Sequence, residues 1–282
     1  MNNKKTNEEI VTPEKAINKC FISMSQNCLE LMPYETYFGT AIARALLLMF
    51  IPLYIYFTYV IFSNDNLDLI GSYLPFATFS LLLFGIEYMY TSQITKISNI
   101  VFNRKTNKIY TYHRGITYIN DLDDVIISGG AKTIISVHHR NANGISITRH
   151  IEIDDEWNVK LIIDYIKSFT SQGPNNLIIP TEYEWADREK INIAFSPLKA
   201  LIHYAPWPFC GKITDPLEKT LKIYMWPFYV LIYFPLNIMA SFLWYPFTKI
   251  FNIKPHPVPE EAYEDDDSIR VTPEMAAKGI RP

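Results

Sequence analysis

Two long runs without a charged residue lie near the beginning of the chain. The first covers residues 45–64 and the second residues 69–86, with a short polar link between them. An α-helix rises about 1.5 Å per residue, so roughly 20 apolar residues cross the ~30 Å hydrocarbon core of a bilayer. The pattern predicts a transmembrane helical hairpin over residues 41–92. The alternative is a hairpin buried in a soluble core, which two adjacent runs of this length disfavour.

The charges around the hairpin predict its orientation. The link holds Asp65 and Asp68 but no lysine or arginine, whereas Arg44 precedes the first run and Lys96 follows the second. Basic residues concentrate in the cytoplasmic flanks of membrane helices. We therefore expect both ends of the hairpin in the cytoplasm and its tip outside.

A third uncharged run covers residues 223–248 and contains Pro227, Pro235 and Pro246. It is long enough to cross a membrane, but a proline-bent re-entrant or interfacial segment would also explain it. Because lysines lie on both sides of the run, the flanking charges do not choose between the two forms. Both alternatives stay open, and we favour the non-crossing form. Residues 249–282 follow as an acidic polar tail.

In residues 97–172 the apolar and polar positions first follow the two-residue period of short strands and then the period of a helix. Strands are predicted at residues 97–102, 108–113, 116–119, 125–128, 133–139 and 145–153. In the last of these the isoleucines share one face, as a half-buried antiparallel strand requires. An amphipathic helix then begins at Asp154 or Asp155 and ends before Gly173. Its apolar face would hold Trp157, Leu161, Tyr165 and Phe169.

These elements together predict an α+β membrane protein. It has an N-terminal transmembrane hairpin, a small antiparallel β-barrel closed by a C-terminal helix, and a further apolar, proline-broken membrane segment. Residues 1–40 are expected to form a cytoplasmic or interfacial helix, and residues 175–222 a cytoplasmic connection. The sequence Val-Thr-Pro-Glu occurs at residues 11–14 and again at 271–274. Threonine suits the N-cap and proline the first helical position, so two short helices are expected there.

Composition and motifs exclude several classes of function. The net charge of −3 gives no electrostatic footprint for nucleic acid. The three cysteines lack the spacing of a zinc site or a disulfide framework. The chain has no G-x-S-x-G motif, P-loop or dinucleotide-binding fingerprint. We therefore expect neither enzymatic activity nor a cofactor.

Two clusters that resemble metal ligands have simpler explanations. His138 and His139 are neighbours on a predicted strand, so their side chains point to opposite faces and cannot chelate one ion. Asp121, Asp123 and Asp124 lie in a turn before a strand and lack the glycine-bearing loop of a calcium site. No metal site is predicted.

The remaining candidates are charged residues near the hairpin. Antiparallel folding brings Arg44 and Glu87 to similar depths, which predicts an ion pair at the membrane edge. The alternative treats Glu87 as a functional intramembrane carboxylate. Arg104, Lys105 and Lys108 follow the second run and could contact anionic lipid headgroups, with the ordinary cytoplasmic excess of basic residues as the simpler explanation.

The chain resembles known families at two levels. The segment IVFNRKTNKIYTYHRGITYINDLDDVI resembles the opening strands of bacterial pleckstrin-homology-like domains. The order of elements resembles a family of uncharacterised bacterial inner-membrane proteins associated with type VI secretion effector clusters. The best local matches are VFNRKTNKIYTYH, the PWPF of residues 206–209 and the run from Trp226 to Leu236.

The family resemblance implies a non-enzymatic inner-membrane protein that gives immunity against a secreted toxin, or helps to load it, by binding it. The expected partners are membrane lipid and a toxin or secretion component, while homo-oligomerisation stays open. The alternative is a membrane-tethered scaffold or regulator whose β domain binds a partner protein or a lipid headgroup. Transport rests on Glu87 alone and ranks last.

Overall fold

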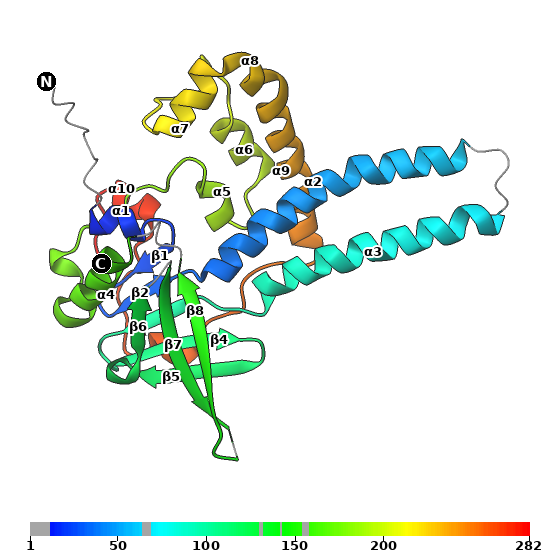
Figure 1. The fold of residues 1–282 in the computed structure, drawn as a ribbon. Helices are drawn as coiled ribbons and strands as arrows, with labels where there is room; N and C mark the ends of the chain where they lie inside the picture. Colours follow the sequence, from blue (N-terminus) through cyan, green and yellow to red (C-terminus); the bar gives the residue numbers. More distant parts are fainter. Residues whose placement is uncertain (1–11, 64–68, 130–131, 142, 154–157) are drawn as a thin grey trace, which may run out of the picture. The chain divides into compact units, whose positions relative to one another are not determined.

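The computed structural model describes residues 12–63, 69–129, 132–141, 143–153 and 158–282, which divide into two compact units. The sheet unit comprises the described residues of Met1–Tyr34, Asn99–Tyr183 and Pro257–Pro282. The helical unit comprises those of Glu35–Ser98 and Glu184–His256. Each unit is thus assembled from segments that lie far apart in the sequence (Figure 1).

The described strands of the sheet unit form two antiparallel sheets. The larger has the order β1-β2-β3-β4-β5 and the smaller the order β6-β7-β8. The strands are β1 (Phe21–Met24), β2 (Cys28–Leu31), β3 (Ile100–Asn103), β4 (Lys108–His113), β5 (Ile116–Asp121), β6 (Ile126–Gly129), β7 (Thr133–Arg140) and β8 (Ser146–Ile153). The six strands predicted between residues 97 and 153 are confirmed.

The closed β-barrel is not found among the described residues. Side-chain hydrogen bonds join β5 and β7. Asn120 accepts a hydrogen bond from His138 N (3.0 Å) and donates one to His138 O (2.9 Å), and the His139 ring contacts Thr117 O (3.1 Å). The asparagine amide has the same donor and acceptor groups as a peptide, so it pairs with the strand in place of a backbone neighbour. Alternation predicts each strand but not how a sheet closes, so the antiparallel strands are confirmed and the closed barrel is not.

The N-terminal helix predicted over residues 1–40 is also wrong in the described part. The helix α1 (Pro13–Ile17) is short and leads into the β1–β2 hairpin, in which Ser25 N donates to Cys28 O at 2.8 Å. β2 then pairs with β3, with Leu29 opposite Phe102. Strands of four residues give too little alternation to recognise, and the partner strand lies beyond the apolar hairpin in the sequence.

The helix α4 (Val159–Gln172) supplies the core of the sheet unit. Its buried side chains are Ile162, Tyr165, Ile166 and Phe169. Trp157 and the two candidate caps lie outside the described residues. The helix ends at Gly173, whose φ of 78° favours glycine. A Cβ atom there would also clash with the guanidinium of Arg104.

Most of the predicted acidic polar tail, the C-terminal segment Pro257–Pro282, belongs to the sheet unit and packs in it. Val271 N donates to Met24 O (2.7 Å) and Met24 N donates to Val271 O (3.0 Å), which makes an antiparallel bridge. Val271 and Ala262 are fully buried. Only isolated small apolar residues of this segment are buried. Its composition is therefore polar overall and gives no sign of the packing. It also contains η5 (Glu260–Tyr263) and α10 (Pro273–Ala277).

The two short helices predicted from the repeated Val-Thr-Pro-Glu sequence are confirmed. Thr12 and Thr272 occupy the N-cap positions of α1 and α10, and proline follows each of them. Neither threonine hydroxyl makes a capping hydrogen bond within the described residues. The proline, with its preset φ, is therefore the stronger of the two helix-start signals here.

The helical unit begins with the predicted hairpin, formed by α2 (Tyr34–Phe62) and α3 (Leu69–Thr95). The two helices pair through aromatic rings, such as those of Tyr54 and Phe76, whose centroids are 5.0 Å apart. The link at residues 64–68, with its two aspartates, lies outside the described residues.

The third apolar run is helical in type throughout, apart from a turn at Met225. After α5 (Arg188–Ile191) and α6 (Pro197–His203) come α7 (Pro216–Lys219), the π-helical η3 (Thr220–Tyr224), α8 (Trp226–Phe228), the π-helical η4 (Tyr229–Tyr233) and α9 (Phe234–Ile250). The π-helical segments precede Pro227 and Pro235, which lack the N–H of a regular α-helical bond. The prolines therefore change the type of helix where a break was predicted.

The three long helices meet at the base of the hairpin. Ala43 of α2, Ile94 of α3 and Trp244 of α9 belong to one buried apolar cluster. Gly39 of α2 lies against Tyr90 and Ile94 of α3, where a Cβ atom would be in van der Waals contact at 3.4 Å. The helix α9 thus contacts the first turns of α2 and the last turns of α3.

The packing of the C-terminal segment can be tested at Val271. We expect Val271→Ala to lower the free energy of unfolding by about 1–3 kcal/mol, because it removes buried methyl groups and leaves a cavity. Ile269→Ala is the matched control, since Ile269 is 58% exposed and its truncation should change stability by less than about 0.5 kcal/mol. Pulse proteolysis of the full-length protein across a urea series in mild detergent measures both; equal effects would contradict the packing.

Candidate functional site

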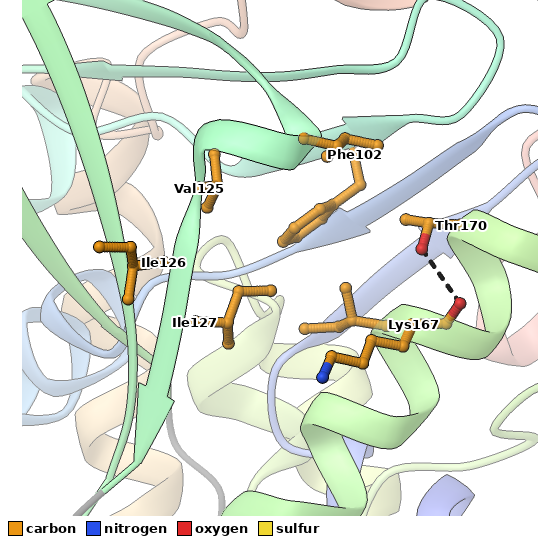
Figure 2. Close-up of a pocket in the computed structure, with 8 residues that line it drawn as sticks. Phe102, Val125, Ile126, Ile127, Lys167 and Thr170 are labelled. Carbon is orange, nitrogen blue, oxygen red and sulfur yellow. Dashed lines mark hydrogen bonds between the residues drawn. The ribbon is translucent and has the colours of Figure 1, made fainter.

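A cavity of about 330 Å³ lies in the sheet unit between the small sheet and α4 (Figure 2). It is lined by Phe102, Leu122, Val125, Ile126, Ile127, Ile166, Lys167 and Thr170. Ligand sites in proteins commonly measure ~300–1,000 Å³. The cavity therefore suits a small ligand or one large side chain of a partner.

Three stretches of chain build its walls. β3 contributes Phe102, which is fully buried. The 3₁₀-helix η1 (Leu122–Asp124) and β6 contribute the aliphatic wall, from which Ile127 points toward α4 (Figure 2). α4 contributes Ile166 and Thr170, which lie one helical turn apart on the same face.

The lining favours binding of an apolar group with a polar end. Among the described lining residues, Lys167 and Thr170 are the polar ones, and the Thr170 hydroxyl already donates to Lys167 O at 3.0 Å. The Lys167 side chain is exposed, so its ammonium group is available to a carboxylate or carbonyl oxygen of a ligand. Ile126, the strand neighbour of Ile127, is 60% exposed and points to the other side of β6 (Figure 2).

A second feature is a buried cation in the helical unit. Lys222 is 1% exposed, and its Nζ donates to His203 O (2.9 Å) and to Glu218 Oε1 (2.7 Å). The ammonium also lies 5.3 Å from the ring centroid of Trp185 and 5.9 Å from that of Tyr229. Burial of a charge is costly unless it is paired and hydrogen-bonded, and here the carboxylate, the carbonyl and the ring faces supply those contacts.

The imidazole of His203 stacks on Trp185 at 5.2 Å between centroids, and its Nε2 has no hydrogen-bond partner among the described residues. Burial lowers the pKa of His203 from 6.5 to about 3, with further lowering by the positive charges of Arg188 and Lys222. The imidazole is therefore neutral near pH 7. The cluster joins α6 to η3 and η4 through hydrogen bonds and aromatic contacts.

The predicted ion pair between Arg44 and Glu87 is not formed as a hydrogen-bonded contact. Arg44 Nη2 donates to Ser241 Oγ (3.0 Å) and to Asn237 O (3.3 Å), both on α9. Both carboxylate oxygens of Glu87 are buried and accept no hydrogen bond from the described residues. The prediction considered the hairpin alone, and α9 supplied partners for Arg44 that the local sequence could not reveal.

The candidate headgroup residues do not converge on one site. Lys105 Nζ donates to Asp265 O (3.3 Å) and lies 3.8 Å from Asp265 Oδ1. The Arg104 guanidinium lies against Gly173, and Lys108 is opposite Asp121 in the β4–β5 ladder. Headgroup binding by these residues stays a prediction.

The clusters that resembled metal ligands take part in separate contacts. Asp123 accepts a hydrogen bond from Asn107 (3.1 Å), His138 contacts Thr148 Oγ1 (2.9 Å) and His139 contacts Thr117 O (3.1 Å). Within the described ranges, no group of three His, Cys, Asp or Glu residues could hold a metal ion.

Sequence reasoning missed both the cavity and the Lys222 cluster. The cavity is built from residues 102, 122–127 and 166–170, and no local motif marks their meeting. The lone Lys222 before a long apolar run carried a usable signal, because a lysine flanked by aromatic residues at such an edge suggests partial burial.

The burial of His203 predicts a specific pH dependence. Its folded pKa of about 3 lies below the ordinary 6.5, so the unfolded chain binds a proton in that interval and the folded chain does not. The free energy of unfolding is therefore unaffected by His203 above pH 6.5. Below pH 6.5 it falls with the pH, by up to about 1.4 kcal/mol per pH unit. Imidazole NMR should find His203 neutral at pH 5, and His203→Gln should flatten this part of the stability profile. A His203 signal that titrates near pH 6 would contradict the burial.

Comparison of the chain with protein-family models, with curated proteins and with solved structures found no match.

Proposed function

We propose that the protein is a membrane-anchored binding protein. In this proposal the α2–α3 hairpin crosses the bilayer and the sheet unit binds a partner on the cytoplasmic side. The observation that carries the proposal is the exposure of apolar side chains along both helices of the hairpin.

The exposed fraction reaches 69% at Tyr59 of α2 and 72% at Leu81 of α3. Tyr34–Ile61 and Trp226–Ile250 are long and apolar enough to cross a membrane by length and composition, and 18% and 22% of their most apolar windows are buried. A core helix of a soluble protein would be mostly covered, and large exposed apolar surfaces need a lipid or protein neighbour. Lipid is the neighbour that we propose for the hairpin.

The flanking charges support the orientation. The link between α2 and α3 carries acidic residues, whereas Arg44 and Lys96 lie at the other ends of the helices. The positive-inside rule then assigns the sheet unit to the cytoplasm, and the family resemblance implies that the membrane is a bacterial inner membrane.

For the partner we propose a secreted toxin or a component of a type VI secretion system, so that the protein acts as an immunity or accessory factor. The resemblance to pleckstrin-homology-like domains supports a recognition role, and so does the six-strand order that precedes α4. The cavity supports it chemically, since it can take one apolar side chain of a protein partner next to Lys167. The alternative is a scaffold or regulator whose sheet unit binds a resident protein or a lipid headgroup.

Membrane insertion can be tested with Leu81→Arg. Because Leu81 is 72% exposed, a soluble protein would tolerate this change, whereas a charge near the centre of a membrane helix costs about 2.5–3.5 kcal/mol. Ile145→Arg is the matched control, because Ile145 is 60% exposed on the β7–β8 hairpin. We expect the wild type and Ile145→Arg to stay in the membrane pellet after carbonate extraction and Leu81→Arg to be depleted. Normal amounts of a soluble Leu81→Arg protein would refute the anchor.

The cavity can be tested with Ile127→Glu, which puts an acid on the side of β6 that faces α4. Affinity purification of the full-length protein in mild detergent, followed by mass spectrometry, is expected to recover a toxin or secretion component with the wild type. We expect Ile127→Glu to lower that recovery by about tenfold or more, as the loss of a well-packed contact does, while Ile126→Glu, on the exposed side of the same strand, leaves it unchanged.

Cell assays separate the two functions. Immunity predicts that cells without the protein die in contact with toxin-secreting kin and survive alone. A scaffold role predicts a defect in the absence of any attacker, with resident membrane proteins recovered in the purification.

A further inference from the structure

The first and last segments of the chain constrain its path through a membrane. Met24 and Val271 are bridged in one sheet unit, so both lie on the same side of any bilayer that the hairpin crosses. The chain leaves this unit after Tyr183 and returns to it at Pro257. It must therefore cross an even number of times in between. The described part of this interval contains a single helix of spanning length, Trp226–Ile250, and one crossing would separate the bridged strands.

The contacts of α9 agree with this constraint. Ser241 receives its hydrogen bond from Arg44, at the beginning of the apolar part of α2. Phe251 contacts Phe84 on α3, with ring centroids 6.2 Å apart. In Figure 1, α9 lies across the hairpin near its base and does not run alongside it.

The same part of the helical unit exposes large apolar side chains. Leu198 and Ile202 lie on one face of α6 and are 70% and 71% exposed, while Phe209 in the following loop is 81% exposed. Trp207 is 51% exposed, and its carbonyl accepts a hydrogen bond from Trp226 Nε1 at 2.8 Å. This bond joins the loop to the start of the third apolar run, so the exposed groups form part of one connected surface.

The charge of this surface is positive. Lys199, Lys212 and Lys219 are exposed and have no acidic partner within the described residues. The two acids of the same stretch are engaged internally: Asp215 caps α7 through Leu217 N (2.7 Å), and Glu218 binds Lys222. Unpaired lysines next to exposed aromatic and aliphatic groups match the headgroup and upper acyl layers of an anionic membrane.

We propose that α6, the loop at residues 206–210 and the segment α8–α9 form an interfacial platform that lies in the plane of the cytoplasmic leaflet and binds anionic lipid. Trp207 and Phe209 insert below the headgroups, and the lysines contact the lipid phosphates. The inference rests on the proposed anchor and assigns the third apolar run to the interface.

The path of the chain is tested first, by cysteine labelling in full-length protein that carries Cys210→Ser. Cys20 and Cys28 are buried, and burial raises the pKa of Cys28 to about 12, so both should stay unreactive. Ile269→Cys and Ile145→Cys are expected to react with a membrane-impermeant maleimide in inverted vesicles and not in spheroplasts, and Asp65→Cys in the hairpin link should do the opposite. Labelling of Ile269→Cys and Ile145→Cys on opposite sides would overturn the proposal.

The platform itself is tested by tryptophan quenching in phosphatidylglycerol-containing vesicles. The fluorescence difference between the wild type and Trp207→Phe gives the emission of Trp207. We expect lipids brominated near the headgroup to quench this emission and aqueous iodide to leave it unchanged. Quenching by iodide would show an exposed surface and overturn the proposal. Protection of Trp207 from both quenchers would also overturn the proposal if the double variant Trp207→Ser/Phe209→Ser forms a smaller particle in detergent than the wild type. The surface would then bind a second copy of the protein.

These outcomes are distinct from failure of the anchor. A protein that carbonate releases from the vesicles contradicts the proposed membrane insertion. A retained protein whose Trp207 is accessible to iodide contradicts the platform alone.

Discussion

The antiparallel bridge between Met24 and Val271 is the contact on which the organisation of the chain depends. It joins the first described strand to the C-terminal segment, across the long hairpin and the third apolar run. A backbone pair buried in an apolar core is not given up easily, because each unpaired N–H or C=O group would lose a hydrogen bond without regaining water. The bridge therefore holds the first strand and the C-terminal segment in one unit, to which the chain returns after the hairpin and again after the third apolar run.

Two buried cations organise the helical unit in a comparable way. Arg44 reaches the backbone and hydroxyl groups of α9, and Lys222 reaches His203 O and Glu218 between aromatic rings. In apolar surroundings each cation is stable only where several partners converge. These contacts consequently fix the base of the hairpin against α9 and fix α6 against η3. The inner side of α6 thus packs against a core in which Lys222 has polar and aromatic partners.

The sequence predicted the elements with strong local periodicity, and it failed where pairing is between distant segments. The hairpin, the six strands after it and α4 were recognisable because apolar runs or alternation extend over many residues. The strands at Phe21–Met24 and Cys28–Leu31 were too short for that, and they are specified by pairing with β3. The same holds for the sites. Arg44 was predicted to pair with Glu87 at the membrane edge, but its hydrogen-bond partners lie on α9. The cavity near Lys167 draws its walls from three separate segments.

The two kinds of apolar helix in the helical unit differ in what covers them. The hairpin is exposed on several sides along its middle, at Ile55 and Tyr56 as well as at Leu81. The helix α9 is covered on one side, where Ala240 and Trp244 pack at four-residue spacing, and exposed on another. A helix that needs lipid all round is solvated by crossing a bilayer, whereas one that needs lipid on one side is solvated by lying at its surface. In the proposed topology the hairpin crosses the bilayer and α9 lies at its surface, which agrees with this difference in the side chains that are covered.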